Sequence, residues 1–156
     1  MKKRTLKQMQ KMLDVHFHDE WGRILDDINI MRQHGTQSGN QVNIHPTLMS
    51  DFLIHFRILH EFFYGKKDKR VCKAKDYIKW NKKESKRIKI WNRRIHEYLA
   101  HLSYSRLKRW RPWPIQSLLY PHYRKITIRF IKELPPKYNS RLLGDLKQRL
   151  ISEVRI

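Results

Sequence analysis

Hydrophobic residues recur every three or four positions through most of this chain, which is the period of an amphipathic α-helix. In the first segment the spacing continues from Leu6 to Met31, about seven turns, and a loop is predicted at residues 34–40. A second helix is predicted from Pro46, a residue suited to a first helical turn, to Gly65, which ends it. The first third of the chain is therefore predicted to form two helices.

Three further helices are predicted after a lysine-rich connection. The third covers residues 86–106 and is stopped by the Arg-Pro-Trp-Pro sequence at 111–114. The fourth covers 115–134 with a kink or restart at Pro121, although residues 126–130 alternate as a strand would. The last follows Pro135-Pro136, is capped by Asn139 or Ser140, and covers 139–154.

This pattern predicts an all-α fold, a four- to five-helix bundle with a long amphipathic N-terminal helix. At 156 residues the chain is long enough for one domain with its own core. We expect residues 46–134 to form the core of the bundle and 139–154 to add a C-terminal helix. Residues 1–34 either join the bundle or stand apart as an N-terminal extension.

Positive charge is the strongest compositional signal. The chain has 35 Lys and Arg against 14 Asp and Glu, a formal net charge of +21, whereas the net charge of a small domain typically has a magnitude of roughly 2–8. Eighteen of these cations and only four acids lie between Gly65 and Arg111. Because such an excess repels itself, we expect a polyanion, most simply nucleic acid, to bind this segment.

The acids are concentrated elsewhere. Five of the 14 lie on the first helix, at Asp14, Asp19, Glu20, Asp26 and Asp27. Its outer face is therefore less suited to nucleic acid, and it can pack against a basic face of the same chain or of a partner.

Aromatic residues are interspersed among the cations of the middle segment. Unpaired bases stack on aromatic rings, so this combination suits single-stranded or irregular RNA better than a duplex groove, and we favour RNA over DNA as the partner. Trp91 and Tyr98 lie on the apolar face of the third helix and are expected in the core, whereas Trp110 and Trp113 are candidates for stacking. The residues predicted to bind nucleic acid are Lys66, Lys67, Lys69, Arg70, Lys73, Lys75, Lys82, Lys83, Lys86, Arg87, Arg93, Lys108, Arg109, Trp110, Arg111 and Trp113.

Composition argues against several other classes. Cys72 is the only cysteine, which excludes an intrachain disulfide and a cysteine-rich zinc site. No apolar run reaches the ~18–20 residues that span a bilayer, and no apolar secretory core follows the basic start. We therefore expect a cytoplasmic protein with no membrane partner, no metal and no cofactor.

Arg94 and His101 are the best candidates for catalysis. Seven residues apart on the predicted third helix, they project from nearly the same face. Beside bound RNA, a histidine can act as acid or base while a guanidinium stabilises the charge that develops on the phosphate. Among the other histidines, His55 is expected in the core, and His60 with Glu61 either hydrogen-bonds within the fold or lines a cleft.

Three segments carry a resemblance to a known family: FLIHFRIL at 52–59, AKDY at 74–77 and AHLSYSR at 100–106. Over about residues 50–130 they resemble small bacterial helical proteins that are similar to HEPN domains. The resemblance implies a four- or five-helix bundle, often dimeric, and a metal-independent ribonuclease of toxin–antitoxin or phage-defence systems with an Arg-x4–6-His motif. Arg94 and His101 match that spacing, although Ile95 follows the arginine where a polar residue is common. The shared polar positions are His55, Arg57, Asp76 and Arg106.

Three functional hypotheses follow. The first is an RNA-binding HEPN-like protein that cleaves RNA without metal. The second is a non-catalytic nucleic-acid-binding subunit of a ribonucleoprotein or defence complex, or a homodimer with that role. The third is an adaptor or inhibitor that binds a nucleic-acid-processing protein.

Overall fold

The computed structural model describes residues 4–34, 36–38, 41–43, 46–66, 68, 71–100 and 113–153. These residues form helices joined by short connections and one hairpin, and the all-α bundle predicted from sequence is confirmed. The helices are α1 (Leu6–Lys11), α2 (His18–His34), α3 (Pro46–Tyr64), α4 (Lys86–Ala100), α5 (Tyr120–Glu133) and α6 (Arg141–Ser152). The hairpin pairs β1 (Thr36–Ser38) with β2 (Gln41–Asn43).

The N-terminal helix is a continuous rod that joins the bundle. Thr5 starts it with a reciprocal capping box, in which its hydroxyl accepts from the Gln8 N–H at 3.2 Å and Gln8 Oε1 accepts from the Thr5 N–H at 2.9 Å. A π-helical segment, Met12–Phe17, connects α1 to α2. In the core, Trp21 Nε1 donates to Thr127 Oγ1 at 3.1 Å, which links α2 to α5. The residues from 1 to 34 therefore do not form a separate extension over their described part.

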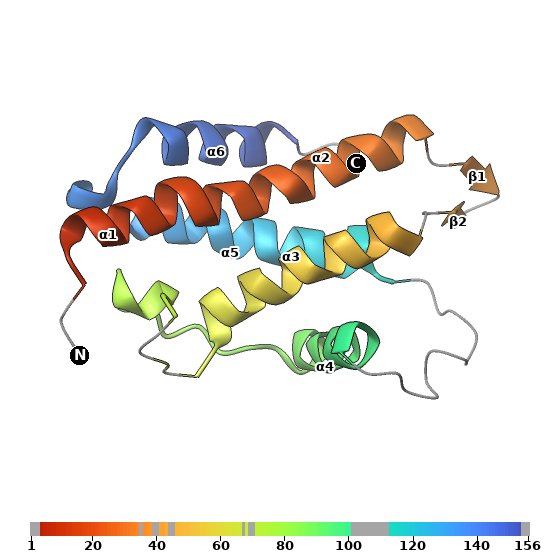
Figure 1. Cartoon of the computed structure of the whole chain (residues 1–156), viewed down its shortest axis with the longest axis horizontal. Coiled ribbons are helices and arrows are strands. Elements are labelled where there is room, and N and C mark those ends of the chain that lie inside the picture. The colour runs from red at the N-terminus through yellow and green to blue at the C-terminus, as the bar shows by residue number, and fades with distance from the viewer. Residues whose placement is uncertain are drawn as a thin grey trace.

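The helices pack as shown in Figure 1. The α1–α2 rod crosses the molecule, α3 runs alongside it, α6 lies along its opposite edge, and α5 lies behind the rod against α6. Helix α4 is seen nearly end-on, so it crosses α3 instead of running parallel to it. The segment between α3 and α4 therefore passes across one end of the bundle, and this segment contains the lysines discussed below.

The core is aromatic where α3, α5 and the segment before α4 meet. Phe130 of α5 contacts Phe17, Phe62 and Phe63 with ring centroids 5.2–5.9 Å apart, and Trp80 at 6.1 Å. These tilted and edge-on contacts add to the energy of burying apolar surface. They also hold the extended chain around Trp80 against the bundle.

Helix ends agree with the local signals, and two sequence interpretations need correction. Helix α3 begins at Pro46 and ends before Gly65, and the Ser140 hydroxyl caps α6 by accepting from the Leu143 N–H at 3.2 Å. Residues 126–130, which alternate like a strand, lie within α5, where Ile126, Thr127 and Phe130 face the core. The predicted loop at 34–40 is wrong in part, since residues 36–38 form β1, which pairs with β2 just after the predicted loop. The predicted third helix is described as far as Ala100.

Candidate nucleic-acid interface

Six cations form a basic strip on the segment that leads into α4 and on its first turn. All six side chains are exposed, and within the described residues none forms an ion pair with a carboxylate. The basic strip consists of Lys79, Lys82, Lys83, Lys86, Arg87 and Lys89. Lys79 and Lys89 were not among the residues predicted from sequence, although each lies three or four residues from a predicted cation.

Local structure leaves these cations without an acidic partner. Glu84, the only acid within the basic strip, turns inward and accepts a hydrogen bond from His60 Nε2 at 2.7 Å. The Ser85 hydroxyl accepts from the Ile88 N–H at 3.3 Å and starts α4, and Ile88 is buried in its first turn. Burial of Ile88 on one side therefore directs Lys86 and Lys89 outward on the other.

The basic face continues along α4. Lys89, Arg93 and His96 follow one another at intervals of four and three residues, so they lie on one side of the helix. Ile88 and Ile95 are buried on the opposite side. Arg93 is exposed, and its guanidinium lies 3.8 Å from Glu97, one turn later.

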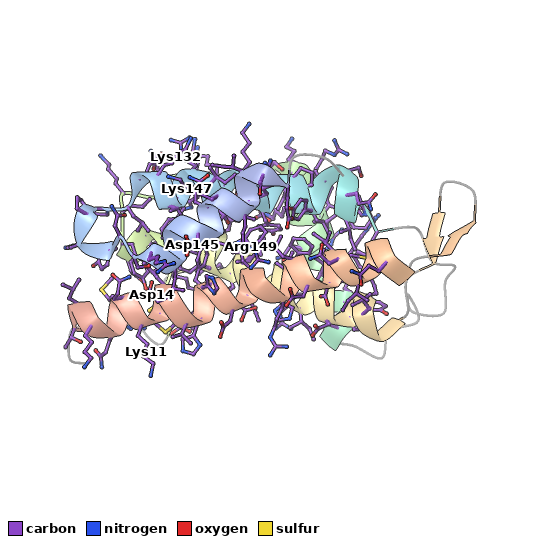
Figure 2. The ribbon with its side chains drawn as sticks, turned by 90° about the horizontal axis from the view of Figure 1, so that it is seen from above. Lys11, Asp14, Lys132, Asp145, Lys147 and Arg149 are labelled. Atoms are coloured by element: carbon purple, nitrogen blue, oxygen red, sulfur yellow. The ribbon has the colours of Figure 1, made fainter. Side chains whose placement is uncertain are left out.

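A second group of cations lies on α5 and α6, where more of the charge is balanced. Figure 2 shows the labelled cations of this face and of the α1 edge: Lys132, Lys147, Arg149 and Lys11. Arg129 pairs with Glu133 at 2.5 Å, and Arg141 lies 3.7 Å from Asp145. The positive charge is thus not confined to the middle third. Within the part of the chain that the structure describes, the basic strip is the group that combines several exposed cations with an inward-turned acid.

The acids of the N-terminal helix are partly used inside the fold. Asp14 accepts from the Ser140 hydroxyl at 2.5 Å, Glu20 bonds to His55, and Asp27 is buried. Asp19 and Asp26 are exposed. The expected acidic outer face is therefore reduced to fewer residues than the sequence suggested.

Lys73 is not on the surface where it was predicted to bind nucleic acid. Its side chain is 2% exposed and its ammonium group forms an ion pair with Glu61. Its backbone N–H also donates to Asp76 Oδ2 at 2.8 Å. A buried ammonium needs such a partner because desolvation of an unpaired charge is costly. Lys73 therefore stabilises the connection after α3 and is not available to a phosphate.

Trp113, a candidate for stacking on a base, also packs on its own chain, and its role in binding stays a prediction. Its ring is half-buried, with its centroid 5.5 Å from those of both Trp91 and Tyr98. Trp91 and Tyr98 pack against the core as expected. Arg94 places its guanidinium carbon 4.6 Å from the centre of the Trp91 ring, a cation–π contact. His101 lies outside the described residues, so the pairing of Arg94 with His101 stays a prediction.

The polar residues of the family resemblance have separate environments. His55 is buried, with Nδ1 2.5 Å from Glu20 Oε2 and Nε2 3.5 Å from Asp51 Oδ1. Burial disfavours its charged form, but the hydrogen bond to Glu20 and the charges of Glu20, Asp51 and Asp27 outweigh this and raise the pKa of His55. Asp76 pairs with Arg4 at 3.7 Å. His55 thus has the core position expected from sequence.

The other predicted binding residues divide into two sets. Lys66 and Lys75 are exposed, as are Lys82, Lys83, Lys86, Arg87 and Arg93. The rest lie outside the described residues: Lys67, Lys69, Arg70, Lys108, Arg109, Trp110 and Arg111. Arg106, a polar position of the family resemblance, also lies outside them.

Two histidines, His60 and His122, lie on either side of Tyr64 beside the basic strip. His60 is hydrogen-bonded to Glu84, and Tyr64 is bonded through its hydroxyl to His122 Nε2 at 3.0 Å. The Tyr64 ring lies between the two imidazoles, 5.3 Å from His60 and 6.0 Å from His122. Burial lowers the pKa of His122, helped by His60 and Lys125 and opposed by Glu84, and burial raises the pKa of Tyr64 to about 12. We call these four residues, His60, Tyr64, Glu84 and His122, the histidine cluster.

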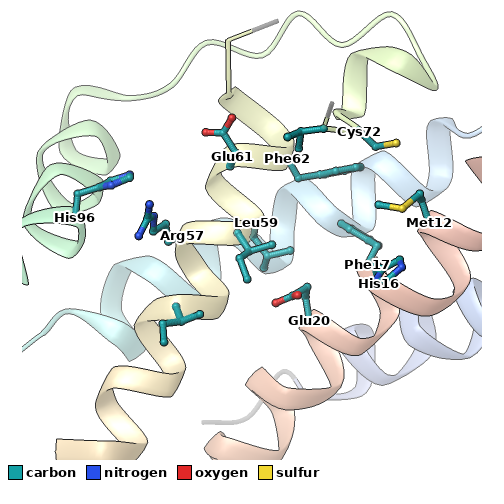
Figure 3. A pocket seen from close by; sticks show the side chains of 13 residues that line it. Met12, His16, Phe17, Glu20, Arg57, Leu59, Glu61, Phe62, Cys72 and His96 are labelled. Carbon is teal, nitrogen blue, oxygen red and sulfur yellow. The ribbon is translucent and has the colours of Figure 1, made fainter. Parts of the chain in front are cut away.

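A groove of about 450 Å³ lies over the outward face of α3. Figure 3 shows α3 as its floor, the π-helical segment and α2 on one side, and α4 on the other. Ile54, Ile58 and Phe62 from α3 supply apolar surface, and Arg57 and His96 point toward one another. The groove could not be predicted from the sequence, because it depends on how the π-helical segment, α2 and α4 pack around α3.

Nothing among the described helices is both long and apolar enough to cross a bilayer. Over the same residues, no three His, Cys, Asp or Glu side chains are arranged to hold a metal ion. Comparison with known proteins finds no family model, no curated protein and no solved structure that matches this chain.

Proposed function

We propose that this protein binds single-stranded RNA along the basic strip and the adjoining face of α4. The observation that carries the proposal is the set of six exposed cations from Lys79 to Lys89 with no ion-pair partner among the described residues. Glu84, the acid nearest to them, is bonded to His60 and does not neutralise them. Unbalanced surface charge of this kind attracts phosphates over a distance and holds them by displacing counterions.

We favour RNA because the sequence intersperses aromatic residues among these cations, although Trp80, Trp91 and Tyr98 among them pack against the protein's own core. Single-stranded RNA is recognised by stacking of unpaired bases together with contacts to phosphate and 2′-OH. The protein acts in the cytoplasm under this proposal, alone, as a homodimer or as a subunit of a larger complex. Its resemblance to HEPN domains remains a prediction.

Salt dependence of binding tests the proposal. Six phosphate contacts on a single strand give a slope of log affinity against log salt of up to about −4. Replacing Lys82, Lys83 and Lys86 together with Gln should make this slope about 2 less steep and weaken binding. Fluorescence anisotropy with a labelled RNA oligonucleotide measures both quantities.

A matched control comes from the α5–α6 face. Replacing Lys132, Lys147 and Arg149 with Gln removes the same charge from the surface drawn in Figure 2. The slope should then stay near that of the parent. Equal changes in both triple variants would mean that net charge alone attracts RNA, and the basic strip would lose its role.

A second candidate function is metal-independent RNA cleavage, which the histidine cluster favours. Two imidazoles with different hydrogen-bond partners can supply the base that takes the 2′-OH proton and the acid that protonates the leaving oxygen. His122, whose pKa burial lowers, is the group suited to act as base. Glu84 belongs to the histidine cluster and lies between Lys83 and Lys86 of the basic strip. An RNA strand bound along the basic strip would therefore pass close to the cluster.

Cleavage in excess chelator tests this second function. The His60→Gln and His122→Gln variants should each lose cleavage while circular dichroism stays that of the parent, and His18→Ala serves as the control. A DNA strand of the same sequence should remain intact because it has no 2′-OH. If cleavage is retained in both Gln variants but is lost in Arg94→Ala, the pair predicted from sequence is the site instead.

A further inference from the structure

Among the described residues that line the groove over α3, one charge is unbalanced, and it is positive. Glu20 is engaged by His55, and Glu61 is engaged by Lys73, so both acids of the groove have partners within the fold. Arg57 is exposed and forms no ion pair with any described carboxylate. The groove therefore offers a guanidinium beside apolar surface, which suits a ligand with an anionic group attached to a flat or apolar body.

The floor of the groove is unusually apolar for an exposed helix face. Ile54 is 42% exposed and Ile58 is 41% exposed, one turn apart on α3, and Phe62 follows after another turn. Their spacing of four residues makes them one continuous ridge. A volume of about 450 Å³ is within the range of sites that hold small organic molecules.

The groove is continuous with the basic face of α4. His96 lines the groove and lies seven residues after Lys89, so both project from the same side of α4 about 10 Å apart along the helix. Figure 3 shows His96 and Arg57 facing each other from α4 and α3. A phosphate chain that follows α4 from the basic strip thus reaches Arg57 at the mouth of the groove.

We infer that the groove binds one unpaired nucleotide of the strand, with its phosphate on Arg57 and His96 and its base on Ile54, Ile58 and Phe62. This inference rests on the proposed RNA binding. Cationic groups along a backbone path with an aromatic or apolar surface for bases are the general design of single-strand sites. The free guanidinium distinguishes this occupant from an uncharged apolar molecule.

An abasic nucleotide separates binding of the base from binding of the phosphates. Anisotropy is measured for an RNA oligonucleotide and for the same oligonucleotide with abasic positions, which keeps every phosphate. Stacking of one base gives roughly a 5- to 100-fold difference in affinity for the parent protein. The Ile58→Gln variant should lose most of this difference, and Arg57→Gln should weaken both ligands.

Leu142→Gln is the matched control, because Leu142 is an exposed apolar residue of α6, 45% exposed, outside the groove. It should bind both oligonucleotides as the parent does. If Ile58→Gln also keeps the full difference, the groove does not hold the base and the inference is overturned, while RNA binding by the basic strip stands. Binding of decanoate in the groove in preference to a nucleotide overturns it as well.

Failure of the proposed function has a different signature. If the parent protein binds no RNA at any salt concentration, the basic strip is not an RNA site. Titration with adenosine and guanosine monophosphates then tests the groove directly by nuclear magnetic resonance. Saturable binding that Arg57→Gln abolishes would retain the groove as a nucleotide site, and no binding would remove it.

Discussion

Asp27 is a buried carboxyl group whose ionisation should oppose folding. It lies between α2 and α3 with 5% of its surface exposed, and its Oδ2 atom has no hydrogen-bond partner in the described structure. Burial raises the pKa of Asp27 from 3.8 to about 6. The charges of Asp51 and Asp26 add to this increase, whereas His55 and Arg23 act in the opposite direction.

The sign of the effect follows from proton linkage. Between pH 4 and 6 the folded protein holds the Asp27 proton more tightly than the unfolded chain does, so the free energy of unfolding falls as the pH rises. The difference between 3.8 and about 6 corresponds to about 3 kcal/mol, at about 1.4 kcal/mol per pH unit. Well above pH 6, the free energy of unfolding is therefore lower by this full amount than it is at low pH.

Replacing Asp27 with Asn removes the ionisation and keeps the shape of the side chain. The free energy of unfolding of Asp27→Asn, minus that of the parent, should increase by about 2–3 kcal/mol from pH 4 to pH 7 and then stay level. Urea unfolding followed by circular dichroism at one-unit intervals of pH measures it. Subtraction removes the effects of groups that do not interact with Asp27. His55 does interact with it, and because the pKa of His55 is raised, its stabilisation begins to be lost only as the pH rises above 6.5, so the change below pH 6.5 is the part that reports on Asp27.

Asp26→Asn is the control for this experiment, because Asp26 is the exposed neighbour on the same helix. The difference between Asp26→Asn and the parent should change little from pH 4 to pH 7. If the free energy of unfolding of Asp27→Asn, minus that of the parent, also changes little from pH 4 to pH 7, the Asp27 carboxylate is well solvated in the folded protein. The reasoning from burial would then be refuted.

Three further stability predictions can be tested by the same unfolding assay. A methyl group at Gly65 would lie 2.3 Å from the Glu61 carbonyl oxygen and 2.5 Å from Lys73 Nζ, so Gly65→Ala should lower the free energy of unfolding by about 1–3 kcal/mol; an unchanged value would show that the backbone relaxes freely. Glu61→Gln leaves the buried Lys73 ammonium unpaired and should cost about 2 kcal/mol, which a second change, Lys73→Met, should largely restore. Thr127→Val removes the acceptor of the Trp21 N–H and should cost about 1–3 kcal/mol, and a smaller loss would mean that the indole finds another partner.

Helix positions were predictable from the sequence because helices are specified by local interactions. The three- and four-residue spacing of apolar side chains predicted the buried face of α2, including Trp21 and Ile24. Pro46, Gly65 and Ser140 marked helix ends through backbone geometry and capping, which involve residues only a few positions away. The sequence also located the excess of positive charge, since charge depends on composition alone.

Side-chain partners could not be predicted, because they are set by how the helices pack. Lys73 resembles its neighbouring lysines in sequence, yet the turn at the end of α3 places it beside Glu61 and buries it. Glu84 faces His60 only because the segment before α4 crosses the end of α3. The groove likewise requires Arg57 and His96 to approach from two crossing helices.

The sequence by itself thus determined an all-α bundle, its main helices and an unusually basic middle segment. The tertiary structure decided which of those cations are exposed and which acids neutralise them. The physical reason is one of range: a helix is stabilised by hydrogen bonds between residues four positions apart, whereas Glu61, Lys73, Glu84 and His60 pair only after helices far apart in the chain have packed together.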